Sequence, residues 1–428
     1  MKMFGTVRWT VVALLFLGGM INYLDRSAIA VAAPFLTKQL SLSPSELGWV
    51  FSAFFFGYAT FCFVGGYASD RIGGRNVFAV ASIVWSVFCG LTAFVFSYAS
   101  LLAVRVIFGM GEGPYGSATN KLVSNWFPRR QQASAVGWAN AGTPLGGAIA
   151  GPIVGFIALT YGWRVSFIVI AIIGLCWAIA WMLLVTDRPE QNPNASAAEL
   201  QEIAADPVAP SDGPQVKLAT LLIRPGVLAT AFAFFGYAYI LYFFLSWFPS
   251  YLTMQQHLSI KSMSFVSAIP WLLGFVGLAG GGMVSDAIYR LIGNAVLARK
   301  LVLVVGLLVA AVCVALAGMV TGATAAVALM TVSVFFMYLS GHTYFTLILD
   351  TIEKDRVGGV SGFVHLIANL AGIVAPAATG YMVQASGSFA SAFVLTGAIA
   401  VLGALSVAVF VRTPTIEVQR LGSAVSRA

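Results

Sequence analysis

Apolar runs of about 20 residues recur along the whole chain, and each is long enough, as an α-helix, to cross the hydrocarbon core of a bilayer. The chain is 59% hydrophobic and 9% charged, whereas roughly 25% of the residues of an ordinary soluble domain are charged. The sequence therefore predicts an all-α membrane protein and excludes a soluble enzyme.

Polar and Gly/Pro-rich segments divide the apolar sequence into twelve predicted spans. These are residues 9–36, 45–68, 76–97, 100–122, 132–158, 164–185, 226–254, 263–288, 299–319, 323–348, 359–384 and 388–411. The polar segment 187–220 separates the first six spans from the last six. We expect an N-terminal six-helix bundle at 1–186, a cytoplasmic linker at 187–220, a C-terminal six-helix bundle at 221–412 and a cytoplasmic tail at 413–428.

An internal repeat indicates that the two bundles are pseudo-symmetric. Gly65-Gly66-Tyr67-Ala68-Ser69-Asp70 follows the second span, and Gly281-Gly282-Met283-Val284-Ser285-Asp286 follows the eighth. In transporters built from two repeats, the substrate binds near the membrane midplane between the halves. The repeat therefore favours a transporter architecture.

Basic residues indicate the orientation in the membrane. The chain has 23 Lys and Arg against 15 Asp and Glu. If both termini are cytoplasmic, most of the Lys and Arg residues fall in loops that face the cytoplasm, as the positive-inside rule requires. Because this topology accounts for the positive charge, we expect no nucleic-acid partner.

Away from the ends of the predicted spans there are four Asp, Glu, Lys or Arg side chains, and all four are in the first half: Asp25, Arg26, Arg105 and Glu112. Such groups cost roughly 2.5 to 3.5 kcal/mol each on insertion scales and usually mark a transport pathway. Arg26 and Arg105 suit an anion, because a guanidinium binds a carboxylate through two parallel hydrogen bonds. Asp25 and Glu112 are candidate proton carriers, since a substrate carboxylate that engages an arginine frees an acid to bind a proton. Alternatively, the four groups form pairs across the helices that only hold the first and fourth spans together.

Uncharged polar groups in the spans are further candidates for substrate binding. Tyr23, Tyr58 and Asn369 offer hydroxyl and amide groups, although transmembrane tyrosines often only pack. His342 and His365 suit a polar cavity better than a metal site, because no third ligand lies near either in sequence. The four cysteines are isolated, so the sequence predicts no metal site.

The segment Gly66-x-x-x-Asp70-Arg71-x-Gly73-x-Arg75 lies in a short turn between spans. Its spacing fits either a rigid turn or a cytoplasmic gate, in which Asp70, Arg71 and Arg75 bond to another helix end in one conformation only.

This segment resembles the signature of the major facilitator superfamily. The wider pattern resembles its anion:cation symporter family, which includes bacterial sugar-acid transporters and the sialin and vesicular glutamate group. The matching residues are Asn22-Tyr23-Leu24-Asp25-Arg26, Phe51-Ser52-Ala53-Phe54, Arg105-x-x-x-Gly109-x-x-Glu112, Asn120-Lys121, Trp126-Phe127-Pro128, Trp247-Phe248-Pro249-x-Tyr251-Leu252 and Asn369-Leu370-Ala371-Gly372-Ile373-Val374.

The resemblance implies a twelve-helix transporter of the bacterial inner membrane that imports an organic carboxylate with protons by alternating access. It places Asp25 and Glu112 at the proton-coupling positions, Arg26 and Arg105 at the arginine positions, and Tyr23, Tyr58 and Asn369 at the cavity. Thr143 stands where galactonate-type members carry Gln, and His365 stands where Asn is usual. The segment with His342 also differs from the sugar-acid members.

These departures leave the substrate open among hexonates, hexuronates and aldarates, with aromatic or dicarboxylic acids as the alternative. A proton-driven antiporter, an anion exchanger and a non-transporting anion sensor are the competing functions. We expect a monomer with protons as the coupling ion and no other cofactor. No Cys-His, Ser-His or metal-ligand set suggests catalysis.

Overall fold

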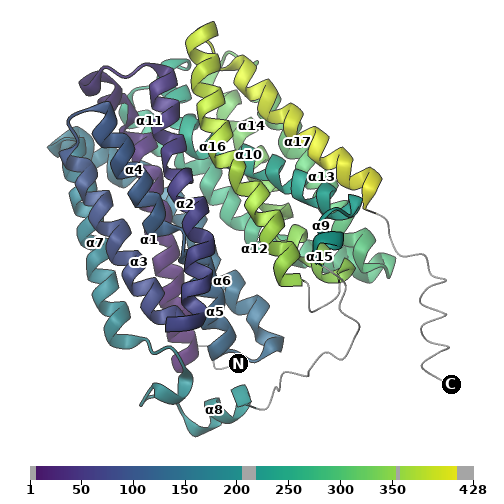
Figure 1. The fold of residues 1–428 in the computed structure, drawn as a ribbon. Helices are drawn as coiled ribbons and strands as arrows, with labels where there is room; N and C mark the ends of the chain where they lie inside the picture. The colour runs from purple at the N-terminus through teal and green to yellow at the C-terminus, as the bar shows by residue number, and fades with distance from the viewer. Residues whose placement is uncertain (1–5, 205–217, 353–356, 412–428) are drawn as a thin grey trace.

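The computed structural model describes residues 6–204, 218–352 and 357–411. Within these ranges the chain is helical and has no strand. Figure 1 shows two groups of helices side by side, coloured purple to blue for the first half and teal to yellow for the second. The predicted tail 413–428 and part of the predicted linker, 205–217, lie outside the described residues.

Long helices make up both halves. The first half contains α1 (Val7–Leu40), α2 (Pro44–Ile72), α3 (Gly74–Leu91), α4 (Tyr98–Glu112), α5 (Tyr115–Trp126), α6 (Arg129–Tyr161) and α7 (Trp163–Leu184). Two short helices, α8 (Ala197–Ala204) and α9 (Leu218–Leu222), lie between the halves in sequence. The second half contains α10 (Pro225–Met254), α11 (Ile260–Val266), α12 (Ala268–Ile292), α13 (Ala295–Ala317), α14 (Ala323–Ser340), α15 (Thr343–Thr351), α16 (Val357–Ser386) and α17 (Ala390–Phe410).

Eleven helical segments of the described chain are long and apolar enough to span a membrane. The remaining predicted span, 100–122, is divided at Gly113-Pro114 into α4 and α5. The span 323–348 likewise divides at Gly341-His342 into α14 and α15. Each of these two spans therefore consists of two helices joined by a short turn. Glu112 and His342 each lie directly at such a break.

Turn chemistry explains the boundaries around α2. Ser43 caps α2, because its hydroxyl accepts the Glu46 N–H at 3.3 Å while the Glu46 carboxylate accepts the Ser43 N–H at 2.8 Å. At the other end, Gly73 adopts a φ of 87° and joins α2 directly to α3. Only glycine adopts this conformation without strain.

The two halves pair their helices in the same way. In the first half α1 packs on α6, α2 on α4 and α3 on α7. In the second half α10 packs on α16, α12 on α14 and α13 on α17. In each half the first span packs on the fifth, the second on the fourth and the third on the sixth. The packing therefore has the pseudo-symmetry that the repeat predicts.

Glycines set the closeness of the α1–α6 contact. A Cβ atom added at Gly142 or Gly146 would lie 2.0 Å from the carbonyl oxygen of Phe16 or Met20. The neighbouring Gly147 faces the second half, where an added Cβ would lie 2.5 Å from the Trp271 ring. Helix α6 therefore uses adjacent glycines for packing within its half and between halves.

We call the end of the molecule where α1 begins the proximal end, and the end where α1 finishes the distal end. Helices α2 and α16 join the halves toward the distal end. There Gly48 lies against Gly380, and the Ser52 hydroxyl donates to the Ile373 carbonyl at 2.7 Å. Helices α6 and α12, and α1 and α10, form the other large contacts between halves.

Candidate functional site

A buried ion pair joins α1 to the end of α4. The Arg26 guanidinium donates to Glu112 Oε2 from Nε at 2.9 Å and from Nη2 at 2.5 Å. The Arg26 side chain is 3% exposed and the Glu112 side chain 0%. Pairing across helices, expected from the sequence, is therefore present for these two residues. The second oxygen of Glu112 is buried without a hydrogen-bond partner.

Three aromatic rings surround the Arg26 guanidinium. Its central carbon lies 5.1 Å from the Tyr23 ring centroid, 4.8 Å from that of Phe54 and 4.7 Å from that of Tyr58. Rings at these distances attract a guanidinium through their quadrupoles and fix its orientation. Tyr23 and Tyr58 are only half-buried. Arg26 is thus held at one position beneath partly accessible rings.

Asp25 and Arg105 are also buried, but neither forms an ion pair within 4.0 Å among the described residues. Asp25 Oδ1 accepts the backbone N–H of Arg26 at 3.0 Å. The Arg105 Nε donates weakly to the Val50 carbonyl at 3.4 Å, and its guanidinium lies 5.0 Å from the Phe54 ring centroid. Of the two arginines, only Arg26 forms an ion pair with a carboxylate in the described part of the chain.

A polar chain on α16 and α10 belongs to the second half. Asn369 Oδ1 accepts the Tyr242 hydroxyl at 2.9 Å, and Asn369 Nδ2 donates to the His365 carbonyl at 2.9 Å. The His365 ring is exposed and lies 6.0 Å from the Phe234 ring and 6.2 Å from the Phe345 ring. Asn369 is therefore fixed on both sides, while the His365 imidazole is accessible.

Two other predicted binding residues differ in their surroundings. His342 is half-buried at the break between α14 and α15. Thr143 lies at the α1–α6 contact near Gly19, and its hydroxyl donates to the Asn140 carbonyl at 2.8 Å on its own helix. Thr143 is thus used for helix packing in this conformation. In the described part of the chain no three His, Cys, Asp or Glu side chains are placed to hold a metal ion.

Trp271 on α12 is a site residue that the sequence analysis missed. Its ring lies 5.9 Å from the Tyr23 ring of the first half and 4.9 Å from the Phe244 ring of α10. Aromatic residues make up 13% of the chain, so nothing in the sequence distinguishes this tryptophan from those that only pack. Tyr242, whose ring lies 4.3 Å from Phe55, was missed for the same reason.

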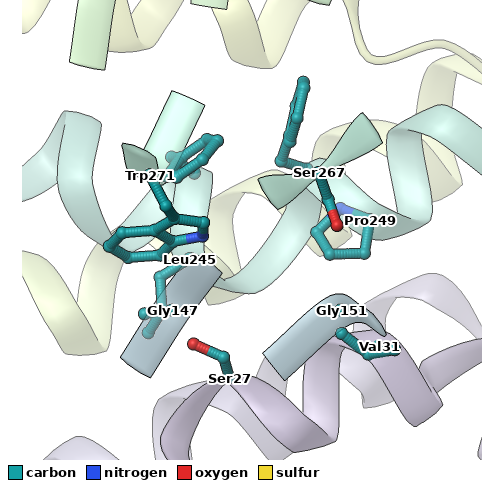
Figure 2. A pocket seen from close by; sticks show the side chains of 10 residues that line it. Ser27, Val31, Gly147, Gly151, Leu245, Pro249, Ser267 and Trp271 are labelled. Carbon is teal, nitrogen blue, oxygen red and sulfur yellow. The ribbon is translucent and has the colours of Figure 1, made fainter. Parts of the chain in front are cut away.

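A small cavity lies beside Trp271, between α1, α6, α10 and α12 (Figure 2). Its volume is about 10 Å³, which is room for about one water molecule. Figure 2 shows Ser27 and Val31 of α1 facing Trp271, Ser267 and Pro249 across it. Apart from this cavity, the halves pack directly against each other at this level, as at Gly147 and Trp271.

The faces of α2 and α16 that meet at the distal end are partly exposed toward the proximal end. On α2, Phe55 is 1% exposed and lies against Gly372, whereas Cys62, two turns nearer the proximal end, is half-buried. On α16, His365 is exposed on the same face as Asn369 and Gly372. The inter-half faces are covered distally and accessible at these proximal positions.

The predicted gate residues bond within the first half. Lys121 Nζ of α5 lies 2.9 Å from Asp70 Oδ1, and the Arg71 guanidinium lies 4.5 Å from the Tyr67 ring. Arg75 donates to the carbonyls of Val185 and Met182 at 2.5 Å each, at the end of α7. In the second half the repeat residue Asp286 pairs with Arg299 at 2.8 Å.

Comparison with known proteins places this geometry among transporters. The model of the Major Facilitator Superfamily matches residues 15–341. The chain is 48% identical over 412 residues to a hexuronate transporter of Bacillus subtilis, with 96% of each chain covered. It is 35% identical to a probable sulfoacetate transporter of Cupriavidus necator, covering 90% of each. It is 30% identical to a probable galactarate/D-glucarate transporter of Escherichia coli K12, covering 92% of each.

A solved structure shares the same fold. A bacterial homologue of the human lysosomal transporter Spinster, in an inward-facing and unoccupied conformation, superposes with a TM-score of 0.76. The two are 18% identical, and the match covers 96% of this chain and 99% of that one. At this identity the likeness concerns the fold alone.

Proposed function

Since this chain belongs to the major facilitator superfamily, whose members here are multi-pass membrane transporters rather than enzymes, we propose that it imports a sugar acid together with protons. Hexonates, hexuronates and aldarates are the substrate candidates. The similarity to a hexuronate transporter over nearly the full length supports this class. Hexuronates are therefore the first compounds to test.

The buried Arg26–Glu112 pair is the observation that carries the proposal. The Arg26 guanidinium is the group best suited to a substrate carboxylate, and in this conformation it binds Glu112 instead. Both of its hydrogen bonds go to one carboxylate oxygen of Glu112. A proton on Glu112 weakens this pair, and the freed guanidinium then binds the substrate carboxylate through two hydrogen bonds. Proton and substrate binding thus favour each other, which is a coupling between two sites. Asp25, which precedes Arg26 on α1 and is also buried, is the candidate carrier of a second proton.

We propose that import proceeds by alternating access. We assign the proximal end to the cytoplasm, because Arg71, Arg75 and Lys121 lie there and basic residues remain on the cytoplasmic side. In this conformation the contacts of Gly48 with Gly380 and of Ser52 with Ile373 close the distal, periplasmic side. Opening that side requires the α2–α16 contact to part. Asp70, Arg71 and Arg75 are then positioned to serve a gate at the proximal side.

We propose that the transporter acts as a single chain in a bacterial inner membrane, with both termini in the cytoplasm. Protons are its coupling ion, and it uses no other cofactor. The bundles 1–186 and 221–412 are the two bodies that move, and 187–220 is their linker.

Proteoliposomes loaded with a pH-sensitive dye test the proposal. Sugar acids, aldarates and aromatic acids are added outside in turn, and acidification of the lumen is followed. We expect one or more sugar acids to carry protons inward, and empty liposomes to show no signal. Exchange of a labelled sugar acid without any proton movement would contradict symport and indicate an exchanger. Absence of both signals for every sugar acid would refute the proposed substrate class.

A further inference from the structure

The two halves present different chemistry to a substrate between them. In the first half, α1 and α4 carry Asp25, Arg26, Arg105 and Glu112. In the described residues of α10, α12, α14 and α16, Asp, Glu, Lys and Arg are confined to the ends of helices. Between those ends the titratable polar groups of these helices are tyrosines and His365. Positive charge for an anion is therefore available on one side only.

His365 occupies the position on α16 where the inter-half face becomes accessible. His365, Asn369, Gly372 and Pro376 follow one another at intervals of three or four residues and so share one helix face. Gly372 lies against Phe55 of α2, and the Pro376 carbonyl lies 2.6 Å from a Cβ added at Gly48. One turn nearer the proximal end than Asn369, His365 is exposed. An imidazole at this place faces the region that a substrate enters.

Two phenylalanine rings lie near the His365 ring, and among the described residues its nitrogen atoms form no hydrogen bond. The centroids of the Phe234 and Phe345 rings lie 6.0 and 6.2 Å from that of the imidazole, and the hydrogen bond from Asn369 goes to the His365 carbonyl oxygen. A neutral imidazole carries one donor and one acceptor, which together suit a hydroxyl group. A carboxylate offers only acceptors, so it requires a cation or several donors in the same place.

We infer that His365 binds the hydroxyl end of the substrate while Arg26 binds its carboxylate, so that the site selects sugar acids with a single carboxylate. The inference rests on the proposed function and narrows it. The two carboxylates of a six-carbon aldarate lie at opposite ends of the molecule, so Arg26 can neutralise only one. The other would lie on the second half, where the described spans supply no fixed positive charge. When the site closes around the substrate, that carboxylate becomes a buried charge without compensation, which is disfavoured.

Gluconate and glucarate test the inference, because they differ only in a terminal hydroxymethyl or carboxylate group. In proteoliposomes at pH 8, where an ordinary imidazole is neutral, each acid competes with labelled glucuronate in an exchange assay that needs no proton gradient. For the wild-type protein we expect glucarate to compete at least ten-fold more weakly than gluconate. The variant His365→Arg places a cation on the second half and is expected to reduce this ratio at least ten-fold.

His365→Gln is the matched control, since it keeps hydrogen-bonding groups without charge. Whatever its exchange rate, it should retain the preference for gluconate. If His365→Arg does not yield a monodisperse protein, His365→Lys supplies the cation instead. Two outcomes overturn the inference and leave the proposed function intact. One is equal competition by gluconate and glucarate in an active wild-type protein. The other is an active His365→Arg variant that keeps the wild-type preference for gluconate over glucarate. A wild-type protein that exchanges no sugar acid overturns the proposed function itself.

Discussion

The Arg26 side chain combines a two-fold hydrogen bond to Glu112 with three aromatic contacts, and these depend on a planar guanidinium. Lysine keeps the charge but offers a compact ammonium without the fork geometry. We predict that Arg26→Lys lowers the apparent affinity for the transported acid about 10- to 100-fold, which corresponds to roughly 1.4 to 2.8 kcal/mol. Competition in the exchange assay measures it. Lys121→Arg, at the exposed pair with Asp70, is the control and should change affinity less than three-fold.

Glu112 separates coupling from binding. A glutamine at this position cannot carry the transported proton, yet it leaves Arg26 free for the substrate. We predict that Glu112→Gln still exchanges labelled acid at a rate within about ten-fold of wild type but no longer accumulates it when the outside is acidic. Uptake with and without a pH gradient measures both. Gradient-driven accumulation by Glu112→Gln at the wild-type level would show that Glu112 does not couple the proton.

The sequence pointed to the charged residues around Arg26 and to Tyr23 and Tyr58, but not to Trp271 and Tyr242. Asp25, Arg26, Arg105 and Glu112 are conspicuous because ionisable groups are rare in apolar runs. The sequence could not show that Glu112 pairs with Arg26 or that Arg105 lies against Phe54, since these contacts depend on how α1, α2 and α4 are packed. Tyr242 lies in a run that contains many aromatic residues, and Trp271 lies in an apolar run with nothing to distinguish it from a packing residue.

Among the elements, α8 attaches the segment after α7 to the beginning of α1. Glu199 is 3% exposed, accepts the Arg8 N–H at 2.9 Å and lies 3.8 Å from Arg8 Nε. Glu202 pairs with Arg8 Nη2 at 2.7 Å. Without Glu199, Arg8 pairs with Glu202 alone, and the Val7 and Arg8 N–H groups at the start of α1 lose their acceptor.

We predict that Glu199→Ala lowers the free energy of unfolding by roughly 2 kcal/mol and the melting temperature by several degrees. Thermal unfolding of the purified protein in detergent, followed by tryptophan fluorescence, measures the change. Glu190→Ala, at an exposed residue in the same segment, should leave the melting temperature unaltered. Equal melting of Glu199→Ala and wild type would mean that the α8 contact contributes no stability.

The α2–α16 contact depends on glycine at its distal end. A Cβ at Gly380 would lie 2.4 Å from the Pro44 carbonyl oxygen and 3.1 Å from Gly48 Cα. Valine therefore prevents the halves from closing there, although the collision is between halves and spares the packing within each. We predict at least ten-fold slower uptake for Gly380→Val, and a thiol placed by Ser52→Cys should become reactive from the distal side.

Gly322→Val is the matched control for the distal contact, because no atom lies within 4 Å of a Cβ added at Gly322. It should transport at a rate near that of wild type. An unreactive thiol at position 52 together with normal uptake in Gly380→Val would contradict the assignment of this contact as the distal closure.

At the level of elements, the sequence predicted where helices lie better than where they break. Glycines recur throughout these spans, so Gly113 and Gly341 carry no special signal, and Pro is tolerated inside α6, α10 and α16. The two breaks place Glu112 and His342 at helix ends. Non-helical backbone at membrane depth is found where it is buried in protein or lines a pathway.

For the whole molecule, the repeat predicted the arrangement, and the structure supplied the conformation. The matched helix pairs α1–α6 and α10–α16 follow from two similar halves. Which end is closed cannot follow from the sequence, because the same residues build every conformation of a transporter and the conformations differ by only a few kcal/mol.

Cys62 offers a test of that conformation with a native side chain. It lies on the face of α2 that contains Phe55, two turns nearer the proximal end. Cys62 is half-buried, whereas Phe55 is covered by Gly372. A thiol on this face reacts with a water-soluble reagent only if water reaches the inter-half region from the proximal side. A bound substrate in that region then shields it.

We therefore predict that a variant retaining only Cys62 is labelled by a charged maleimide applied to the proximal side, and that a saturating sugar acid slows the labelling at least three-fold. Mass spectrometry of inside-out and right-side-out vesicles measures the rates. A variant retaining only Cys89, which is 2% exposed, should resist labelling, and one retaining only Cys176, which is exposed on α7, should be insensitive to substrate. Labelling of Cys62 from the distal side alone would mean that the distal end, not the proximal end, is open. An unchanged labelling rate with substrate would mean that the substrate does not bind at this face of α2.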